Sequence, residues 1–175
     1  MKNTDLEILA SVKTVAAENG LAGITSRRLG RAAGVNSGLI YHYFESMEQV
    51  LQKAFCMEWQ GFIDSVLANI ADVEDIPFSL RDKARLCFHR LRRELLAQRE
   101  RTLYICAYRS SNRFQDAAAC YEAQLDRVAN KLEPMLDRLT LRCLLSLLLD
   151  SAALDQPEEP LFALWYRLFP EKQNE

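Results

Sequence analysis

Glycine is absent from most of this chain of 175 residues. All six glycines lie at or before Gly61, and none follows it. Rossmann and P-loop phosphate cradles, type I′ hairpins and nucleophile elbows all require glycine at fixed positions. Such sites are therefore excluded from the part of the chain after Gly61, where a strand-rich fold is also not expected.

Long apolar runs, paired cysteines and histidines are also scarce. The most apolar run, residues 143–149, is too short to cross a membrane, and residues 1–20 lack the apolar stretch of a signal peptide. The five cysteines form no CxxC pair and only two histidines are present, so we expect neither a metal site nor a cofactor. An odd number of cysteines without a secretion signal indicates reduced thiols in a cytoplasmic protein.

Apolar residues recur at helical spacing along nearly the whole chain, which predicts an all-α fold of about nine helices. Gly20 is expected to end the first helix, while Thr25, Asn36 and Ser46 are expected to cap the next three. The acidic stretch 72–78 is predicted to be a linker. The later helices are predicted over residues 79–99, 100–113, 114–131, 138–154 and 159–169.

Residues 25–44 match a DNA-binding helix-turn-helix, in which two short helices are joined by a tight turn that contains glycine. Gly30 is small enough to let the second helix cross closely over the first, and Gly34 can adopt the left-handed conformation of the turn. The apolar residues expected to hold the two helices together are Leu29, Val35, Ile40 and Phe44. The pattern predicts an N-terminal three-helix DNA-binding domain followed by a C-terminal helical bundle.

The predicted helix-turn-helix is basic, although the whole chain has a net charge of −2. No Asp or Glu occurs in residues 19–44, whereas Arg27, Arg28 and Arg31 are all present. Arg27 and Arg28 fall in the first turn of a helix, where the helix dipole disfavours cations. When nearby residues offer no stabilising interaction to compensate, such an unfavourable placement indicates a functional surface. A phosphate or a guanine edge would supply that gain, and a solvated basic face is the alternative interpretation.

The run ITSRRLGRAAGVNSGLIYHYFESMEQVL, residues 24–51, resembles the N-terminal signature of the tetracycline-repressor (TetR) family of transcriptional regulators. The shared elements are Thr25, the turn 33–35, Gly38 and the run 40–44, together with the upstream residues Ile8, Leu9, Ala10, Asn19 and Gly20. Beyond residue 55 only the helical layout and the overall size resemble the family.

The resemblance implies that residues 37–43 form a recognition helix that enters the major groove. Base edges would be read from this helix, phosphates would be bound by tyrosine, threonine and serine hydroxyls, and Arg27 would read a guanine. The implied contacts are Thr25, Ser26, Arg27, Arg28, Asn36, Ser37, Gly38, Leu39, Tyr41, His42 and Tyr43. Two positions depart from the family pattern. Met47 stands where a phosphate-binding lysine is usual, and Arg28 replaces a usual acidic residue and is expected to compensate.

The resemblance also implies a homodimer, because the family pairs two C-terminal helices with those of a second copy in a four-helix bundle. Here the helices predicted at 138–154 and 159–169 are richer in Leu, Phe and Trp than one helix pair can bury, with burial inside the monomer as the alternative. The predicted interface residues are Leu144, Leu148, Leu161, Trp165 and Leu168.

The family further keeps a pocket for a small-molecule effector between the DNA-binding domain and the dimer interface. The candidate lining residues are Trp59, Phe62, Phe88, Tyr104, Tyr108 and Tyr121. Several tyrosines in one bundle favour an amphipathic pocket, whereas aromatic residues at helical spacing can equally form a plain core.

Together these features predict a cytoplasmic, dimeric transcriptional regulator, a repressor released from palindromic double-stranded DNA by a small molecule. Residues 1–46 would bind DNA, and residues 47–175 would bind the effector and dimerise. The alternatives are a DNA-binding regulator without a small effector (constitutive, thiol-redox or protein-coupled) and a helical adaptor that has lost DNA binding. An enzyme is not expected, because no Ser or Cys has a credible His base once His42 lies in the recognition helix.

Overall fold

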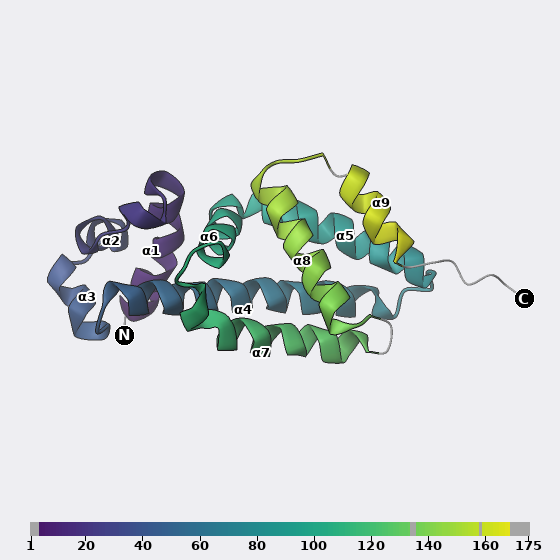
Figure 1. Cartoon of the computed structure of the whole chain (residues 1–175), viewed down its shortest axis with the longest axis horizontal. Helices are drawn as coiled ribbons and strands as arrows, with labels where there is room; N and C mark the ends of the chain where they lie inside the picture. The colour runs from purple at the N-terminus through teal and green to yellow at the C-terminus, as the bar shows by residue number, and fades with distance from the viewer. Residues whose placement is uncertain (1–3, 134–135, 158, 169–175) are drawn as a thin grey trace, which may run out of the picture. The chain divides into compact units, whose positions relative to one another are not determined.

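The computed structural model describes residues 4–133, 136–157 and 159–168, with the backbone alone at Trp165 and Tyr166, and within these ranges it contains nine α-helices and no strand (Figure 1). The prediction of an all-α fold of about nine helices is therefore confirmed. The elements are α1 (Thr4–Asn19), a short 3₁₀ turn η1 (Leu21–Gly23), α2 (Ser26–Ala33), α3 (Ser37–Tyr43), α4 (Met47–Glu74), α5 (Leu80–Ala97), α6 (Arg99–Arg109), α7 (Phe114–Leu132), α8 (Arg138–Ala153) and α9 (Glu159–Arg167).

Short polar side chains begin the helices at the predicted positions. The Thr25 hydroxyl accepts a hydrogen bond from the Arg28 N–H at 3.3 Å, and Asn36 Oδ1 accepts one from the Gly38 N–H at 2.8 Å. Ser46 Oγ accepts from the Gln49 N–H at 3.1 Å. Each bond satisfies one of the N–H groups that have no partner within the first turn of a helix, so the three predicted caps are confirmed.

Two predicted boundaries are wrong. Helix α4 does not stop before residue 72 but continues to Glu74, because Val73 is buried and the Lys83 ammonium group donates to the Glu74 carbonyl at 2.5 Å. Helix α6 ends at Arg109 rather than near residue 113, since Ser111 Oγ accepts from the Arg113 N–H at 3.3 Å. A serine that bonds to nearby backbone in this way favours a turn over a further helical turn.

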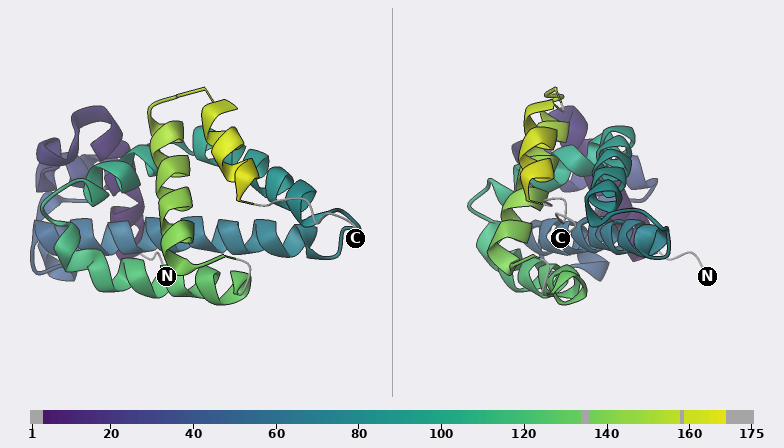
Figure 2. Two further views of the ribbon diagram at one scale, coloured as in Figure 1. Left: turned by 45° about the vertical axis from the view of Figure 1, so that its right-hand side comes forward. Right: turned by 90° about the vertical axis from the view of Figure 1, so that its right-hand side faces the viewer.

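The chain divides into two compact units. The first comprises Met1–Gln60 and Glu100–Ala123, and the second comprises Gly61–Arg99 and Gln124–Glu175. The first therefore holds α1, α2 and α3, most of α6, and the N-terminal parts of α4 and α7. In the second unit, α8 and α9 pack on α5 and on each other (Figure 2).

Candidate nucleic-acid interface

Helices α2 and α3 approach each other at Gly30. A Cβ atom at Gly30 would lie 2.8 Å from the Val35 carbonyl oxygen and 3.1 Å from the Ser37 nitrogen, so only glycine allows the turn to pass so closely. Gly34 has φ 68° and ψ 28°, the left-handed conformation that the turn was predicted to need. Leu29, Ile40 and Phe44 are buried in the small core between these helices, while Val35 is half-buried.

Helix α3 turns most of its surface to solvent. Ile40 is its only buried residue, whereas Leu39, Tyr41, His42 and Tyr43 are exposed. Tyr41 is 54% exposed, and Tyr43 and Leu39 of the same short helix are 43% and 36% exposed. Of the predicted contact residues, Thr25, Arg27, Arg28, Asn36, Gly38, Leu39, Tyr41, His42 and Tyr43 are exposed, and Ser26 and Ser37 are half-exposed.

The two arginines of the first turn of α2 differ in their surroundings. Arg28 Nη1 donates to the Gly23 carbonyl oxygen at 2.7 Å, a local gain that offsets the unfavourable dipole at this position. Arg27 is exposed at the preceding position. The dipole argument for a functional surface therefore applies to Arg27 with more force than to Arg28, and a DNA contact stays a prediction for both.

Met47 is the first residue of α4 and is half-buried, so the helix begins with an uncharged side chain. The exposed Lys53 lies further along α4, with Nζ 5.5 Å from the centre of the Phe44 ring. The ammonium group of Lys53 therefore packs against Phe44, at the end of the helix-turn-helix, and supplies a positive charge from α4.

The predicted effector residues do not come together around one cavity. Trp59, Tyr104, Tyr108 and Tyr121 are buried in the first unit, and the ring centres of Trp59 and Tyr121 are 4.5 Å apart in a stacked arrangement. Tyr104 donates its hydroxyl to the Leu51 carbonyl at 2.7 Å, and Trp59 Nε1 donates to the Tyr121 carbonyl at 3.2 Å. Polar atoms paired with backbone in this way belong to a closed core, and Phe62 and Phe88 are likewise buried, but in the second unit.

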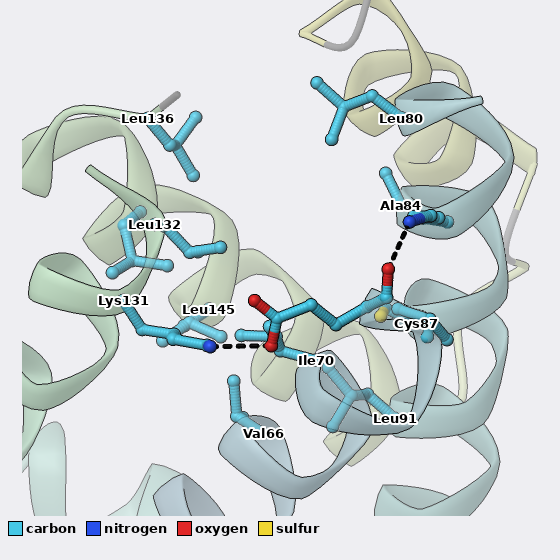
Figure 3. Close-up of a pocket in the computed structure, with 14 residues that line it drawn as sticks. Val66, Ile70, Leu80, Ala84, Cys87, Leu91, Lys131, Leu132, Leu136 and Leu145 are labelled. Carbon is cyan, nitrogen blue, oxygen red and sulfur yellow. Dashed lines mark hydrogen bonds and ion pairs between the residues drawn. The ribbon is translucent and has the colours of Figure 1, made fainter. Parts of the chain in front are cut away.

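A different set of residues lines an apolar cavity of about 240 Å³ in the second unit. Its walls come from α4, α5, α7 and α8, and Figure 3 shows Val66 and Ile70 facing Leu132 and Leu145 across it. None of the six predicted aromatic residues lines this cavity. Sequence reasoning missed it because its lining is aliphatic, and aliphatic residues at helical spacing are the commonest pattern of any helical core.

Two of the predicted interface residues are also misplaced. Leu144 and Leu148 are 2% and 0% exposed, so they form part of the chain's own core and cannot meet a partner without unpacking it. Leu161 is half-buried, Leu168 is exposed, and the side chain of Trp165 lies outside the described residues. The apolar side chains that α8 and the end of α9 leave exposed are Leu139, Cys143, Leu147, Leu154, Leu164 and Leu168.

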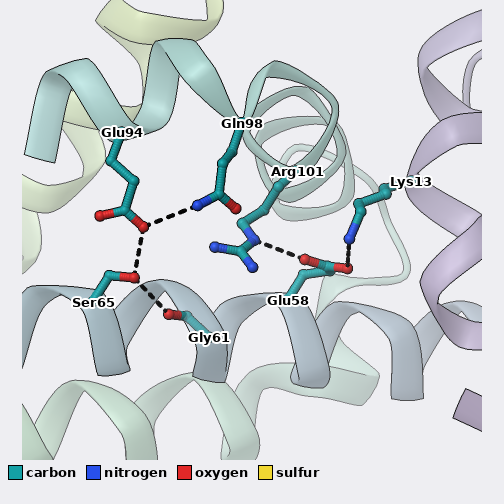
Figure 4. Close-up of polar contacts among 7 residues, drawn as sticks. All are labelled: Lys13, Glu58, Gly61, Ser65, Glu94, Gln98 and Arg101. Atoms are coloured by element: carbon teal, nitrogen blue, oxygen red, sulfur yellow. Dashed lines mark hydrogen bonds and ion pairs between the residues drawn. The ribbon is translucent and has the colours of Figure 1, made fainter.

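A buried carboxylate joins three helices of the first unit. Glu58 of α4 is 3% exposed, and its two oxygens accept from Lys13 Nζ of α1 at 2.6 Å and Arg101 Nε of α6 at 2.8 Å (Figure 4). Thr14 Oγ1 adds a hydrogen bond to Glu100 Oε2 at 2.7 Å. The sequence carried a signal for this site, because Glu58 interrupts the apolar stripe of α4 beside Trp59, and an acidic residue in such a stripe requires a buried cationic partner.

The described side chains provide no metal site, and the thiol of Cys56 is held in its protonated form. No group of three or more His, Cys, Asp or Glu residues in the described ranges could hold a metal ion, and no helix there is long and apolar enough to span a membrane. Burial, with a hydrogen bond between the Cys56 thiol and Cys120 as a smaller cause, raises the pKa of Cys56 to about 12. Thiol oxidation proceeds through the thiolate, so Cys56 is poorly suited to redox sensing.

The exposed surface of α2 and α3, which contains no acidic residue and is followed along the chain by longer helices, is that of the helix-turn-helix class. The sequence model described as "Bacterial regulatory proteins, tetR family" matches residues 8–54. This match covers the predicted helix-turn-helix and agrees with the resemblance of residues 24–51 to the TetR family.

Curated relatives match the same part of the chain. The HTH-type transcriptional repressor KstR2 of Mycobacterium tuberculosis is 33% identical over 69 residues, which is 39% of this chain and 32% of the relative. KstR2 of Rhodococcus jostii is 33% identical over 67 residues, or 38% of this chain and 31% of the relative. The match thus spans about a third of the length of these relatives.

Solved structures extend the similarity to the whole fold. A TetR family transcription regulator from Marinobacter aquaeolei VT8 has a TM-score of 0.66 at 18% identity and covers 97% of this chain and 96% of its own. The multidrug binding protein EbrR, complexed with imidazole, has a TM-score of 0.72 at 20% identity, with 97% of both chains covered. The regulator FadR of Bacillus subtilis, in complex with stearoyl-CoA, has a TM-score of 0.64 at 20% identity over 94% of this chain and 95% of its own. At these identities the likeness is one of fold.

Proposed function

We propose that this chain is a transcriptional repressor that binds palindromic double-stranded DNA as a homodimer and is released from it by a small molecule. The observation that carries this proposal is the exposed face of α3, on which Leu39, Tyr41, His42 and Tyr43 surround a single buried anchor, Ile40. Arg27 is exposed in the first turn of α2, and residues 19–44 contain no acidic side chain. This surface can therefore approach the major groove of DNA and the phosphates that flank it without charge repulsion.

Hydroxyl groups on this surface have the right chemistry for phosphate. The Thr25 hydroxyl accepts a hydrogen bond from the Arg28 N–H, which leaves its own hydrogen free to be donated. Tyr41 and Tyr43 are exposed and can donate in the same way. Gly38 is exposed and has no side chain to keep the helix from a base edge. Proteins that bind DNA place such donors around the recognition helix to fix its orientation.

Dimerisation is proposed because one helix-turn-helix reads too few base pairs for useful specificity, whereas two at a fixed spacing read a palindrome. The surface we propose for it replaces the buried residues predicted from sequence. Leu139 and Leu147 of α8 are 69% and 42% exposed, and Leu164 of α9 is 44% exposed. These exposed leucines lie on α8 and α9, and a second copy of the chain would cover them in a homodimer.

Release by a small molecule is proposed from the course of α4. This helix begins directly after the helix-turn-helix, and its later residues Val66 and Ile70 line the cavity of the second unit. A ligand that favours one position of α4 would therefore change the population of DNA-binding conformations. Residues 1–46 are proposed to bind DNA, and residues 47–175 to bind the effector and dimerise. A DNA-binding role implies a cytoplasmic protein.

Selection from a library of random duplex DNA at moderate salt tests the DNA-binding part of the proposal. We expect enrichment of a palindrome whose half-sites lie about one helical turn apart. Arg27→Ala should weaken binding by roughly tenfold and relax the choice of base at one position in each half-site. The matched control is Arg127→Ala, because Arg127 is an exposed arginine of the second unit that pairs with Asp64. Absence of any enriched sequence with folded protein would refute DNA reading and favour the helical adaptor.

A further inference from the structure

The cavity of the second unit has an apolar interior, and its charged lining residues are Glu74, Lys83 and Lys131. Leu91 and Leu145 are among its buried walls, and the ammonium-bearing Lys131 reaches it from α7 (Figure 3). The side chains of Lys131 and Glu74 are 40% and 57% exposed, so this ion pair lies where the cavity meets water. The cavity is therefore amphipathic, with a hydrocarbon interior and a charged mouth.

The three charges at this mouth do not cancel. Glu74 Oε2 accepts from Lys131 Nζ at 2.7 Å, which pairs one cation with the one anion. Lys83 Nζ donates instead to the neutral backbone carbonyl of Glu74 at 2.5 Å. The hydrogen bond from Lys131 lowers the pKa of Glu74, so the carboxylate remains ionised at neutral pH. Two cations and one anion leave a net charge of +1 among the lining residues.

A single negative charge is what this mouth can accept. A carboxylate at the mouth beside Lys83 and Lys131 would share their ammonium groups with Glu74, gain charge-assisted hydrogen bonds and balance the excess positive charge. A cationic ligand would meet two lysines and an acid that is already paired. A neutral ligand would bury hydrocarbon in the same cavity but would leave the excess charge as it was.

We propose that the cavity binds a hydrophobic monocarboxylate, with the hydrocarbon inside and the carboxylate at Lys83 and Lys131. This proposal rests on the proposed function, since it names the chemical class of the effector. The volume limits the size: about 240 Å³ holds roughly eight non-hydrogen atoms at the ~30 Å³ that each water molecule occupies in the liquid. Octanoate has ten non-hydrogen atoms and fits if its two carboxylate oxygens remain at the charged mouth, whereas a long-chain acid exceeds the space.

Calorimetric titration of the full chain with octanoate, octan-1-ol and octylammonium tests the charge preference directly. We expect octanoate to bind at least tenfold more tightly than either of the others, because the three share one hydrocarbon chain and differ in charge. Palmitate should bind more weakly than octanoate, because its chain is too long for the cavity. Equal affinity for octanoate and octan-1-ol, or tighter binding of octylammonium, would overturn the proposal.

Two variants act on separate parts of the site. Lys83→Gln removes one cation from the mouth and should weaken octanoate roughly tenfold while leaving octan-1-ol unchanged. The matched control, Lys53→Gln, removes an exposed lysine of the first unit and should change neither affinity. Ala84→Leu places a larger side chain in the buried wall and should weaken both ligands. An unchanged octanoate affinity in Lys83→Gln would overturn the carboxylate assignment even if Ala84→Leu failed to fold.

Retention of DNA is measured in parallel so that the two proposals can fail separately. If the chain selects a palindrome but shows no preference for octanoate, the ligand assignment is wrong and the DNA-binding function stands. If octanoate binds with the expected preference but does not lower DNA affinity, the ligand class stands and release by this ligand is wrong.

Discussion

Lys13 of α1 and Glu58 of α4 are joined by an ion pair of 2.6 Å whose carboxylate is 3% exposed. Arg101 of α6 binds the other oxygen of the same carboxylate at 2.8 Å. Ordinary surface pairs contribute little to stability, but a carboxylate removed from water depends on its partners. The pair therefore ties the helix that supports the helix-turn-helix to the start of the helical bundle within the first unit.

Replacing Glu58 should be costly. Glu58→Gln keeps the size of the side chain but leaves Lys13 and Arg101 without their shared anion, and we expect a loss of about 3 kcal/mol in the free energy of unfolding. Urea denaturation measures it. The control is Asp64→Asn, which breaks the exposed pair with Arg127 at 2.8 Å and should cost less than about 1 kcal/mol. Equal losses in the two variants would show that burial of Glu58 does not matter.

Two glycines of the helix-turn-helix should respond differently to alanine. Gly30→Ala places a Cβ 2.8 Å from a backbone oxygen, which must separate α2 from α3 and should cost about 2 kcal/mol of stability together with DNA binding. Gly38→Ala meets only the Asn36 side chain at 3.3 Å, so the fold should persist while DNA affinity falls. Thermal unfolding and DNA titration separate the two effects, and a stable Gly30→Ala variant that still binds DNA would contradict the close crossing.

The hydroxyl of Tyr41 should contribute to DNA affinity and not to stability. Tyr41 is 54% exposed, and Tyr41→Phe should weaken DNA binding about fivefold through a lost phosphate hydrogen bond. Tyr104→Phe is the reverse case, because its hydroxyl is bound to the Leu51 carbonyl in the core. It should lower the free energy of unfolding by about 1–2 kcal/mol and leave DNA affinity unchanged. Unaltered affinity in Tyr41→Phe would remove Tyr41 from the interface.

Adjacent leucines of α8 should separate association from folding. Leu147→Asp puts a charge on the exposed face and should yield a folded monomer in sedimentation velocity, since like charges would meet across the proposed two-fold axis. Leu148→Asp puts the same charge into the core, where Leu148 is fully buried, and should unfold the chain. A wild-type monomer at micromolar concentration, or a Leu147→Asp dimer, would refute the proposed surface.

Cys56 should react slowly with alkylating reagents. Burial raises its pKa to about 12, so the reactive thiolate at pH 8 is on the order of a thousandfold scarcer than for a thiol at the ordinary value of 9.0. Because the pKa lies above the accessible range, the rate of labelling by iodoacetamide should rise about tenfold per pH unit from pH 8 to 10 without levelling. Mass spectrometry follows the site, and chain unfolded in urea gives the reference rate. A plateau near pH 9 would show an unperturbed thiol.

Local chemistry made the helix-turn-helix predictable. Thr25 and Asn36 act on N–H groups two or three residues away, and Gly34 adopts a conformation that other residues avoid, so each signal can be read without knowledge of the rest of the fold. The positions of these residues in the structure therefore match the sequence pattern. Their predicted roles toward DNA depend on a partner and remain proposals.

Long-range packing was less predictable. Helix α8 is apolar on nearly every side, so its sequence could not distinguish the buried Leu148 from the exposed Leu147. For the same reason, aromatic side chains such as Trp59 and Tyr121 could have lined a pocket or filled a core, and they fill a core. The choice depends on which faces the neighbouring helices cover, and a helical period alone does not record this.

The bond from Arg28 to Gly23 does more than offset an unfavourable dipole. When a ligand immobilises a free arginine side chain, the lost conformational entropy costs up to about 2 kcal/mol of binding free energy. Arg28 is exposed, and its hydrogen bond to the backbone holds it in place before DNA binds. The entropy of this side chain is therefore lost during folding and not during DNA binding. Such a preordered guanidinium would give this surface an affinity advantage that comes from entropy, and replacement by lysine would forfeit it while preserving the charge.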